Sequence, residues 1–328
     1  MRALRIYQVE NRNEARLEEM RIEELSSGNV LIRAKYSSVN YKDALAATGR
    51  GKILRRFPLN GGVDVSGVVE ESADKRFKAG DEVLVTGYGL SEDRDGGYAD
   101  YVRVPGDYVV PLPDGLSLLE AMSLGTAGFT AGFVMRRLRD NHQTPEMGPI
   151  AVTGATGGVG SIAIDLLSQA GFEVIAITRK KDEAGAYLRQ LGAHSVMTPQ
   201  DLGIEDAPLA SVRLGGAVDA VGGDLLAALV RSVAPYGNLV SFGLAGGYKL
   251  NTTVMPFILR GVSLLGVSSV QCPMNWRRAI WEELAGPNKP RYLEQIVKRR
   301  VGLDGLAEVF DSILAGENTG RVVVDLER

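Results

Sequence analysis

Residues 150–160 read Ile-Ala-Val-Thr-Gly-Ala-Thr-Gly-Gly-Val-Gly. The apolar start predicts a β-strand, and the glycine-rich turn leads directly into an amphipathic helix from about Gly158 to Ala170. Small residues let the backbone approach a pyrophosphate, whose charge is stabilised by the amides and dipole at the helix N-terminus. Thr156 stands where the G-x-G-x-x-G pattern has its second glycine. The strand-turn-helix context therefore favours a dinucleotide site over an ordinary turn more than the glycine spacing does.

The sequence around this turn alternates between strands and helices. Short apolar runs separated by helical or crossover segments continue to about residue 267. Six strands connected in this way predict a doubly wound parallel sheet of the Rossmann type, an α/β fold. The expected strands are residues 150–153, 173–177, 195–197, 217–221, 238–242 and 262–267, with helices near 158–170 and 182–191.

The N-terminal region has a different pattern. Its short β segments and Gly-rich turns predict an antiparallel or barrel-like unit. An apolar helical run from 118 to 124 marks the change of pattern, and a basic helix end follows at Arg136, Arg137 and Arg139. A last strand at 321–326 comes after the six-stranded sheet is complete, so we expect it to return to the first domain. The expected domains are 1–120 with 267–328, and 121–266.

The residues after the second strand of the sheet indicate which dinucleotide binds. An NAD site has Asp or Glu there for the ribose hydroxyls, whereas residues 178–181 read Thr-Arg-Lys-Lys and the first carboxylate, Asp182, comes late. Cations and a hydroxyl at this place suit the 2′-phosphate of NADP. NADPH is therefore favoured over NAD, and a solvated helix flank is the alternative interpretation.

Composition limits the other functions. The 37 Lys and Arg against 40 Asp and Glu give a net charge of −3, which provides no general attraction for nucleic acid or an anionic membrane. The N-terminus lacks the apolar segment of a signal peptide, and no stretch approaches the length of a membrane span, so a cytoplasmic protein is expected. One cysteine, Cys272, and two histidines, His142 and His194, make zinc improbable on ligand supply. No chemistry is assigned to these three residues.

Long stretches of the chain resemble the medium-chain dehydrogenase/reductase superfamily. Within it, the chain is similar to the zinc-free, quinone-oxidoreductase-like branch of the YhdH/YhfP type, which includes acryloyl-CoA reductases. The resemblance covers essentially the whole chain and implies a GroES-like, β-rich catalytic domain beside the Rossmann sheet. The stretches that carry it are residues 39–45, 58–67, 125–131, 152–160, 256–266 and 272–274.

The resemblance also implies a chemistry. Zinc alcohol dehydrogenases of the superfamily place a cysteine ligand near Asn40 or Tyr41, and a Gly-His-Glu motif at residues 62–64, where this chain has Gly-Val-Asp. Without a Lewis acid, hydride addition to the β-carbon of an enone, quinone or enoyl thioester is favoured over alcohol oxidation. Tyr41 is the candidate hydrogen-bond donor, and Asn40 is a candidate to orient a carbonyl. Asp43 is expected to cap a helix.

By position, the family implies a set of NADPH contacts. A family arginine that adds a phosphate contact corresponds to Ser195 here, a departure that weakens the NADP preference. Leu244 and Ser269 each follow a strand, at the sheet edge where ligands of open sheets bind. The implied contacts are Tyr41, Thr156, Gly157, Gly158, Val159, Thr178, Arg179, Lys180, Leu244, Ile258, Ser269 and Asn318.

Three further expectations concern substrate and partners. The basic run at 49–56 is either a contact for the phosphates of coenzyme A or an ordinary solvated loop. The family implies a homodimer formed through the apolar edge strand 262–267. Alternative functions are a quinone reductase only, a zinc-free alcohol dehydrogenase, or an NADPH-binding sensor or structural protein without turnover.

Overall fold

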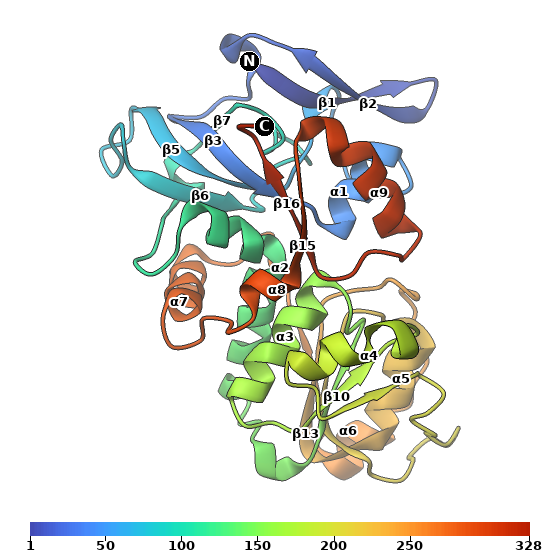
Figure 1. The fold of residues 1–328 in the computed structure, drawn as a ribbon. Coiled ribbons are helices and arrows are strands. Elements are labelled where there is room, and N and C mark those ends of the chain that lie inside the picture. The colour runs from blue at the N-terminus through green and yellow to red at the C-terminus, as the bar shows by residue number, and fades with distance from the viewer. The chain divides into compact units, whose positions relative to one another are not determined.

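The computed structural model describes all 328 residues, in two compact units (Figure 1). Unit 1 comprises residues 1–129, 269–286 and 293–328, and unit 2 comprises residues 130–268 and 287–292. The chain therefore passes between the units four times, because residues 287–292 belong to unit 2 while their flanking segments belong to unit 1. The domain limits expected from the sequence, at 120/121 and 266/267, stay a prediction.

Unit 2 is built on a six-stranded parallel sheet, which confirms the expected doubly wound fold (Figure 1). The central strand β9 pairs with β10 on one side and β12 on the other, which makes the β9/β12 junction the point where strand order reverses. Strand β12 begins earlier than the expected residue 217, at Leu214. The strand order is β11 (Ser195–Met197), β10 (Val174–Ile177), β9 (Ile150–Thr153), β12 (Leu214–Asp219), β13 (Val233–Ser241) and β14 (Ser263–Gly266).

The helices of unit 2 follow from their sequence patterns. Strands β9 and β10 are buried along their whole length, as expected for parallel strands covered on both faces. Helix α3 buries eight of its twelve residues, whereas α4 buries only three of ten. The sheet is accompanied by α3 (Gly158–Gln169), α4 (Lys181–Gln190), α5 (Gly223–Ser232) and α6 (Met255–Arg260).

Unit 1 contains a seven-stranded sheet and a separate three-stranded sheet, mostly antiparallel as expected (Figure 1). The last strand of the chain, β16 (Arg321–Asp325), pairs antiparallel with β3 (Val30–Ser38), which confirms its return to the N-terminal region. The parallel partner of β16 is β15 (Val297–Val301), which the sequence analysis missed. The other strands are β1 (Arg2–Val9), β2 (Arg12–Glu19), β4 (Leu59–Asn60), β5 (Asp64–Ser72), β6 (Glu82–Thr86), β7 (Tyr101–Val104) and β8 (Val110–Pro111).

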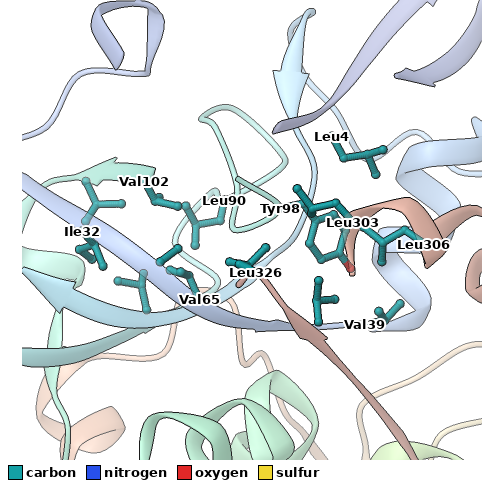
Figure 2. Close-up of a cluster of buried hydrophobic side chains, with 14 of the residues drawn as sticks. Leu4, Ile32, Val39, Val65, Leu90, Tyr98, Val102, Leu303, Leu306 and Leu326 are labelled. Carbon is teal, nitrogen blue, oxygen red and sulfur yellow. The ribbon is translucent and has the colours of Figure 1, made fainter. Parts of the chain in front are cut away.

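The core of unit 1 joins residues from both ends of the chain (Figure 2). Leu4 and Ile32 come from the N-terminal part, and Leu306 and Leu326 come from the C-terminal part. Tyr98 lies inside this cluster at 1% exposure and donates a hydrogen bond from its hydroxyl to Ser38 O at 3.1 Å. The helices of unit 1 are α1 (Tyr41–Thr48), α7 (Met274–Ala285), α8 (Leu293–Ile296) and α9 (Leu306–Leu314).

Helix α2 (Leu118–Asp140) covers the expected helical run and is kinked at Gly125, where φ is 52°. It is long and apolar enough to cross a membrane, which corrects the expectation that no stretch reaches such a length. However, 72% of its most apolar window is buried inside the protein. This burial is typical of a core helix.

Candidate active site

The glycine turn of unit 2 has the geometry of a phosphate cradle. Gly154 adopts a φ of 58°, which favours glycine, and a Cβ on Gly160 would lie 2.4 Å from Gly154 O and 2.8 Å from Ala155 Cα. Helix α3 begins after Gly157 and has no side-chain cap. Its first-turn amides, at Gly158 and Val159, therefore have no partner within the helix and can meet an anion. The residues at this turn fit a bound dinucleotide.

A buried aspartate, which the sequence analysis missed, holds the strand ends beside this turn. Asp219 ends β12 and accepts hydrogen bonds from Thr153 Oγ1 at 2.7 Å and from Gly222 N at 2.8 Å. The Thr153 hydroxyl in turn accepts one from Ala220 N at 3.0 Å. Burial raises the pKa of Asp219. The detectable sequence signal was an aspartate that ends an apolar strand shortly before two glycines.

The cations after β10 differ in their surroundings. Thr178 is buried, and its hydroxyl accepts a hydrogen bond from Lys180 N at 3.0 Å. Lys181 is paired with Asp201 at 2.8 Å. Arg179 is exposed and makes no ion pair. Arg179 is therefore exposed to solvent without a carboxylate partner, whereas Lys181 has one.

The remaining predicted contacts lie in both units. In unit 2, Leu244 is 66% exposed and Ile258 is 71% exposed, which leaves apolar surface for a ligand. Ser269 and Asn318 belong to unit 1 and are half-buried. The Asn318 side chain donates a hydrogen bond to Gly320 O at 3.2 Å.

In unit 1, a buried polar network surrounds Asp64, the first residue of β5. Its Oδ2 accepts hydrogen bonds from Ser38 Oγ at 2.5 Å, Asn40 Nδ2 at 2.8 Å and Thr126 N at 2.9 Å. Its Oδ1 accepts one from Thr126 Oγ1 at 2.5 Å. Both carboxylate oxygens of Asp64, which is 0% exposed, are thus occupied by the protein.

Asp43 is the second buried carboxylate of this network. Its Oδ2 accepts a hydrogen bond from Asn40 N at 2.8 Å, and its Oδ1 accepts one from Val63 N at 2.9 Å. The first contact is half of a capping box at the start of α1, so the expected capping role of Asp43 is confirmed. The cap determines where α1 begins, and therefore where Tyr41 stands.

The cation of the network is Arg321, which is 2% exposed. Its Nη1 donates to Val39 O at 2.9 Å and to Asn40 Oδ1 at 3.2 Å, and its Nε donates to Ser123 O at 3.1 Å. A Cβ on Gly125 would lie 2.7 Å from both Arg321 Nη2 and Asp64 Oδ2, which explains the glycine at the helix kink. The roles of Asp64 and Arg321 were missed, because they are 257 positions apart in the sequence.

The two predicted catalytic residues have different contacts. The amide of Asn40 is bonded to Asp43, Asp64 and Arg321, so its contacts within the protein position the start of α1. Tyr41, the first residue of α1, is 49% exposed and makes no hydrogen bond through its hydroxyl. Of the two, Tyr41 is the residue whose polar group is available to a ligand, and the catalytic roles of both stay proposals.

Stability should fall with rising pH through the titration of Asp43. Burial, followed by the charge of Asp64, raises its pKa from 3.8 to about 7. The folded state therefore binds the proton more tightly, and the stability from this group is present below about pH 4 and lost as the pH rises through about 7. The maximum slope is about 1.4 kcal/mol per pH unit.

Urea unfolding of the wild type and of Asp43→Asn across this pH range measures that contribution as the difference between the two curves. Curves that stay parallel would show that folding does not shift the pKa of Asp43.

No group of three or more His, Cys, Asp or Glu side chains is arranged to hold a metal ion. Cys272 is a buried free thiol. Unit 2 thus contains the glycine turn, and unit 1 contains the exposed Tyr41 and the buried polar network at the start of its helix.

Comparison with known proteins places the chain among dehydrogenases. Residues 26–114 match the alcohol dehydrogenase GroES-like domain, and residues 158–285 match the zinc-binding dehydrogenase family. The acrylyl-CoA reductase AcuI of Ruegeria pomeroyi is 40% identical over 96% of this chain and 95% of its own.

Two solved structures are similar to the chain throughout. The yhdH oxidoreductase of Salmonella enterica in complex with NADP has a TM-score of 0.95 and 40% identity, covering 99% of this chain and 100% of its own. Protein yhfP of Bacillus subtilis with NAD bound has a TM-score of 0.95 and 45% identity, covering 99% of each chain.

Proposed function

The chain belongs to the medium-chain dehydrogenase/reductase superfamily, in its quinone-oxidoreductase-like branch, and on that premise we propose a zinc-independent reductase that uses NADPH. Its proposed substrates are molecules with an activated carbon-carbon double bond, such as an acryloyl-CoA-like thioester or an enone, or a quinone. The observation that carries the proposal is Tyr41, a half-exposed residue whose hydroxyl makes no hydrogen bond within the protein, on a helix start that a buried network holds in place.

The cofactor would be held by the residues of the glycine turn and the end of β10. The amides of residues 156–159 would meet the pyrophosphate, and Thr178, Arg179 and Lys180 would meet the 2′-phosphate. NADPH supplies a hydride from C4 of its nicotinamide. Because yhfP was solved with NAD and the yhdH oxidoreductase with NADP, the choice between cofactors in this chain depends on its own cations.

Arg179→Ala should change this choice. Losing a charged hydrogen bond to phosphate, worth about 1.5–3 kcal/mol, should raise the KM for NADPH by about tenfold or more and leave the KM for NADH nearly unchanged. Steady-state kinetics with both cofactors measures the effect. Arg189→Ala, which removes another exposed arginine from α4 of unit 2, is the matched control. Equal changes for NADPH and NADH in Arg179→Ala would contradict the assignment.

The protein contributes to the reaction by stabilising the negative charge that develops on the substrate. Hydride addition to the β-carbon moves negative charge onto the carbonyl oxygen, which a hydrogen-bond donor stabilises. Tyr41 can donate from its hydroxyl, and water or a protein group then supplies a proton to the α-carbon. Asn40 acts by holding the helix start, through its bonds to Asp43 and Asp64.

Tyr41→Phe tests this role, because it removes the hydroxyl and keeps the ring. Loss of one donor to the developing charge should lower kcat by about 10²-fold, with little change in NADPH affinity. Stopped-flow measurement of NADPH oxidation separates the chemical step from cofactor binding. Tyr36→Phe, a change on strand β3, serves as the control. A kcat within twofold of the wild type would remove Tyr41 from the chemistry.

Zinc independence is proposed from the residues themselves. Asn40 and Tyr41 stand near the expected cysteine ligand, and Val63 and Asp64 stand where the family motif has His and Glu. Both oxygens of Asp64 are already bonded to protein donors. Activity that survives EDTA treatment, with no zinc by metal analysis, is the expected result; activity restored only by added zinc would contradict it.

The function is tested with metal-free protein, NADPH and three electron acceptors: acryloyl-CoA, 1,4-benzoquinone and a simple enone, with NADH as the cofactor control. Selective turnover of the thioester supports an acyl-CoA reductase. Turnover of the quinone alone supports a quinone reductase. NADPH binding without turnover of any acceptor supports a sensor and contradicts the proposed enzyme.

The basic run at 49–56 bears on the thioester. Arg55 lies 3.7 Å from Glu92, and Arg56 donates to Ser26 Oγ at 2.5 Å. Arg50 and Lys52 are exposed and make no ion pair or hydrogen bond through their side chains. These two cations are therefore the ones available to the phosphates of coenzyme A. A variant in which both Arg50 and Lys52 are neutralised tests this role: an unchanged KM for acryloyl-CoA would make them ordinary surface residues.

We also propose a cytoplasmic homodimer paired through β14. This strand is at the edge of its sheet, and Leu264 and Leu265 are only half-buried on it. The neighbouring helix α6 exposes Ile258 and Leu259, at 71% and 60%. An unpaired apolar strand edge favours association with a second copy. Light scattering that shows a monomer at micromolar concentration would contradict the dimer.

A further inference from the structure

Arg277 of helix α7 is a buried cation without a carboxylate partner. Its exposure is 0%, its Nε has no hydrogen-bond partner, and burial lowers its pKa. The guanidinium lies between the rings of Tyr88 and Phe129, 4.5 Å and 4.4 Å from their centroids. Tyr88 stacks in turn on Tyr108, with centroids 4.7 Å apart.

The polar contacts of Arg277 reach a single short segment and one strand end. Its Nη2 donates to Ser269 O at 2.5 Å and to Val270 O at 3.3 Å, and its Nη1 donates to Thr86 Oγ1 at 2.6 Å. The segment begins where the chain enters unit 1 from unit 2, between residues 268 and 269. Arg277 therefore links the end of β6 to the first residues of this crossing.

Tyr88 binds the same segment from the other side. Its amide donates to Val270 O at 3.1 Å, and its hydroxyl donates to Cys272 O at 2.6 Å. Its backbone has a φ of 48°, which is uncommon for a residue other than glycine. Gly87 before it has a φ of 74°, and a Cβ there would contact Val270 Cα tightly, at 3.0 Å. Three of the four carbonyl groups of residues 269–272, those of Ser269, Val270 and Cys272, thus accept hydrogen bonds from Arg277 or Tyr88.

Burying Arg277 in this way costs free energy, so packing alone does not explain the arginine. Removing a guanidinium from water without a carboxylate carries a penalty, which cation–π contacts and carbonyl acceptors only partly offset. An apolar side chain would fill the same space between the rings without this penalty. What an apolar side chain cannot do is hold the carbonyls of Ser269 and Val270 in one orientation.

We infer that Arg277 is a positioning residue for the cofactor, acting through Ser269. This inference rests on the proposed NADPH-dependent function together with the contact between Ser269 and NADPH that the family resemblance implies. Ser269 follows β14, the strand farthest from β10 and β11 in the sheet order. Because a doubly wound sheet binds one mononucleotide on each half, Ser269 belongs with the nicotinamide half of NADPH, and residues 178–180 belong with the adenosine half.

This division allows a selective test with two ligands, NADPH and 2′,5′-ADP, which carries the adenosine half and its 2′-phosphate alone. Arg277→Met keeps an apolar side chain of similar length between the rings. The dissociation constant of this variant for NADPH should rise about tenfold, as expected for the loss of one charged hydrogen bond. Its dissociation constant for 2′,5′-ADP should stay within about twofold of the wild-type value. Arg277→Lys, which keeps the charge, should recover part of the NADPH affinity.

Two further variants separate positioning from packing. Trp281→Phe changes a fully buried residue of the same helix that stacks on Phe129 and whose side chain makes no hydrogen bond. It should lower the Tm and leave both dissociation constants unchanged. Tyr88→Phe removes the hydrogen bond to Cys272 O and keeps the ring. Its dissociation constant for NADPH should rise less than that of Arg277→Met. If Arg277→Met does not fold, Tyr88→Phe serves as the test in its place.

An equal loss of affinity for both ligands, or a lower Tm with unchanged affinity for NADPH, would reduce Arg277 to a structural residue and overturn the inference. Failure of the wild-type protein to bind either ligand would instead contradict the proposed NADPH site. The two failures are therefore distinguishable.

Discussion

Asp64→Leu is expected to destabilise the protein by about 3–5 kcal/mol and to abolish turnover. The substitution leaves the guanidinium of Arg321 buried without the neighbouring charge of Asp64, and it leaves donors of Ser38 and Asn40 without an acceptor. The amide of Asn40 loses one of its three side-chain partners and keeps those to Asp43 and Arg321, so the start of α1, and with it Tyr41, is held less firmly. Urea unfolding and the NADPH oxidation assay measure the two effects.

The control for this prediction is Asp107→Ala. Asp107 is 78% exposed and paired with Arg76, and exposed pairs contribute little to stability. The double variant Asp64→Leu/Arg321→Leu should recover part of the stability but none of the activity, because it removes the buried charge without restoring the contacts of Asn40. If Asp64→Leu proved no more destabilising than Asp107→Ala, the network would not be a determinant of the fold.

Gly160→Ala is expected to weaken NADPH binding by about two orders of magnitude, the result of about 3 kcal/mol lost at the phosphate turn. The added methyl group would lie 2.4 Å from Gly154 O, so the backbone of the turn has to move away from the position in which we propose that it binds the phosphates. Isothermal titration with NADPH measures the loss. The fold should survive, because the methyl group affects one turn.

Gly185→Ala in α4 is the matched control for this second prediction. Its Cβ would meet only the flexible end of Arg189, at 3.2 Å, and alanine favours a helix. It should leave NADPH binding unchanged and raise the Tm slightly. Similar affinity losses in both variants would show that the turn at 154–160 is not the cofactor site.

Much of unit 2 was predictable because its signals are local. A fully buried strand, a glycine turn and an amphipathic helix occupy adjacent residues, so residues 150–169 indicate the strand, turn and helix that form there. The expected capping role of Asp43 was equally local, since a capping box spans only four residues. Strand β15 was missed because Lys298, Arg299 and Arg300 interrupt the apolar pattern of a strand that pairs only with β16.

The sequence by itself determined the fold class, the position of the phosphate turn and the helix start that carries Tyr41, because these depend on neighbours in the chain. The tertiary structure alone decided which buried charges meet. Asp64 and Arg321 come together only because β16 returns to β3, and Arg277 reaches Ser269 only because α7 packs beside Tyr88 and Phe129. No local pattern encodes such contacts, since burial of a charge becomes favourable only when distant segments supply its partners.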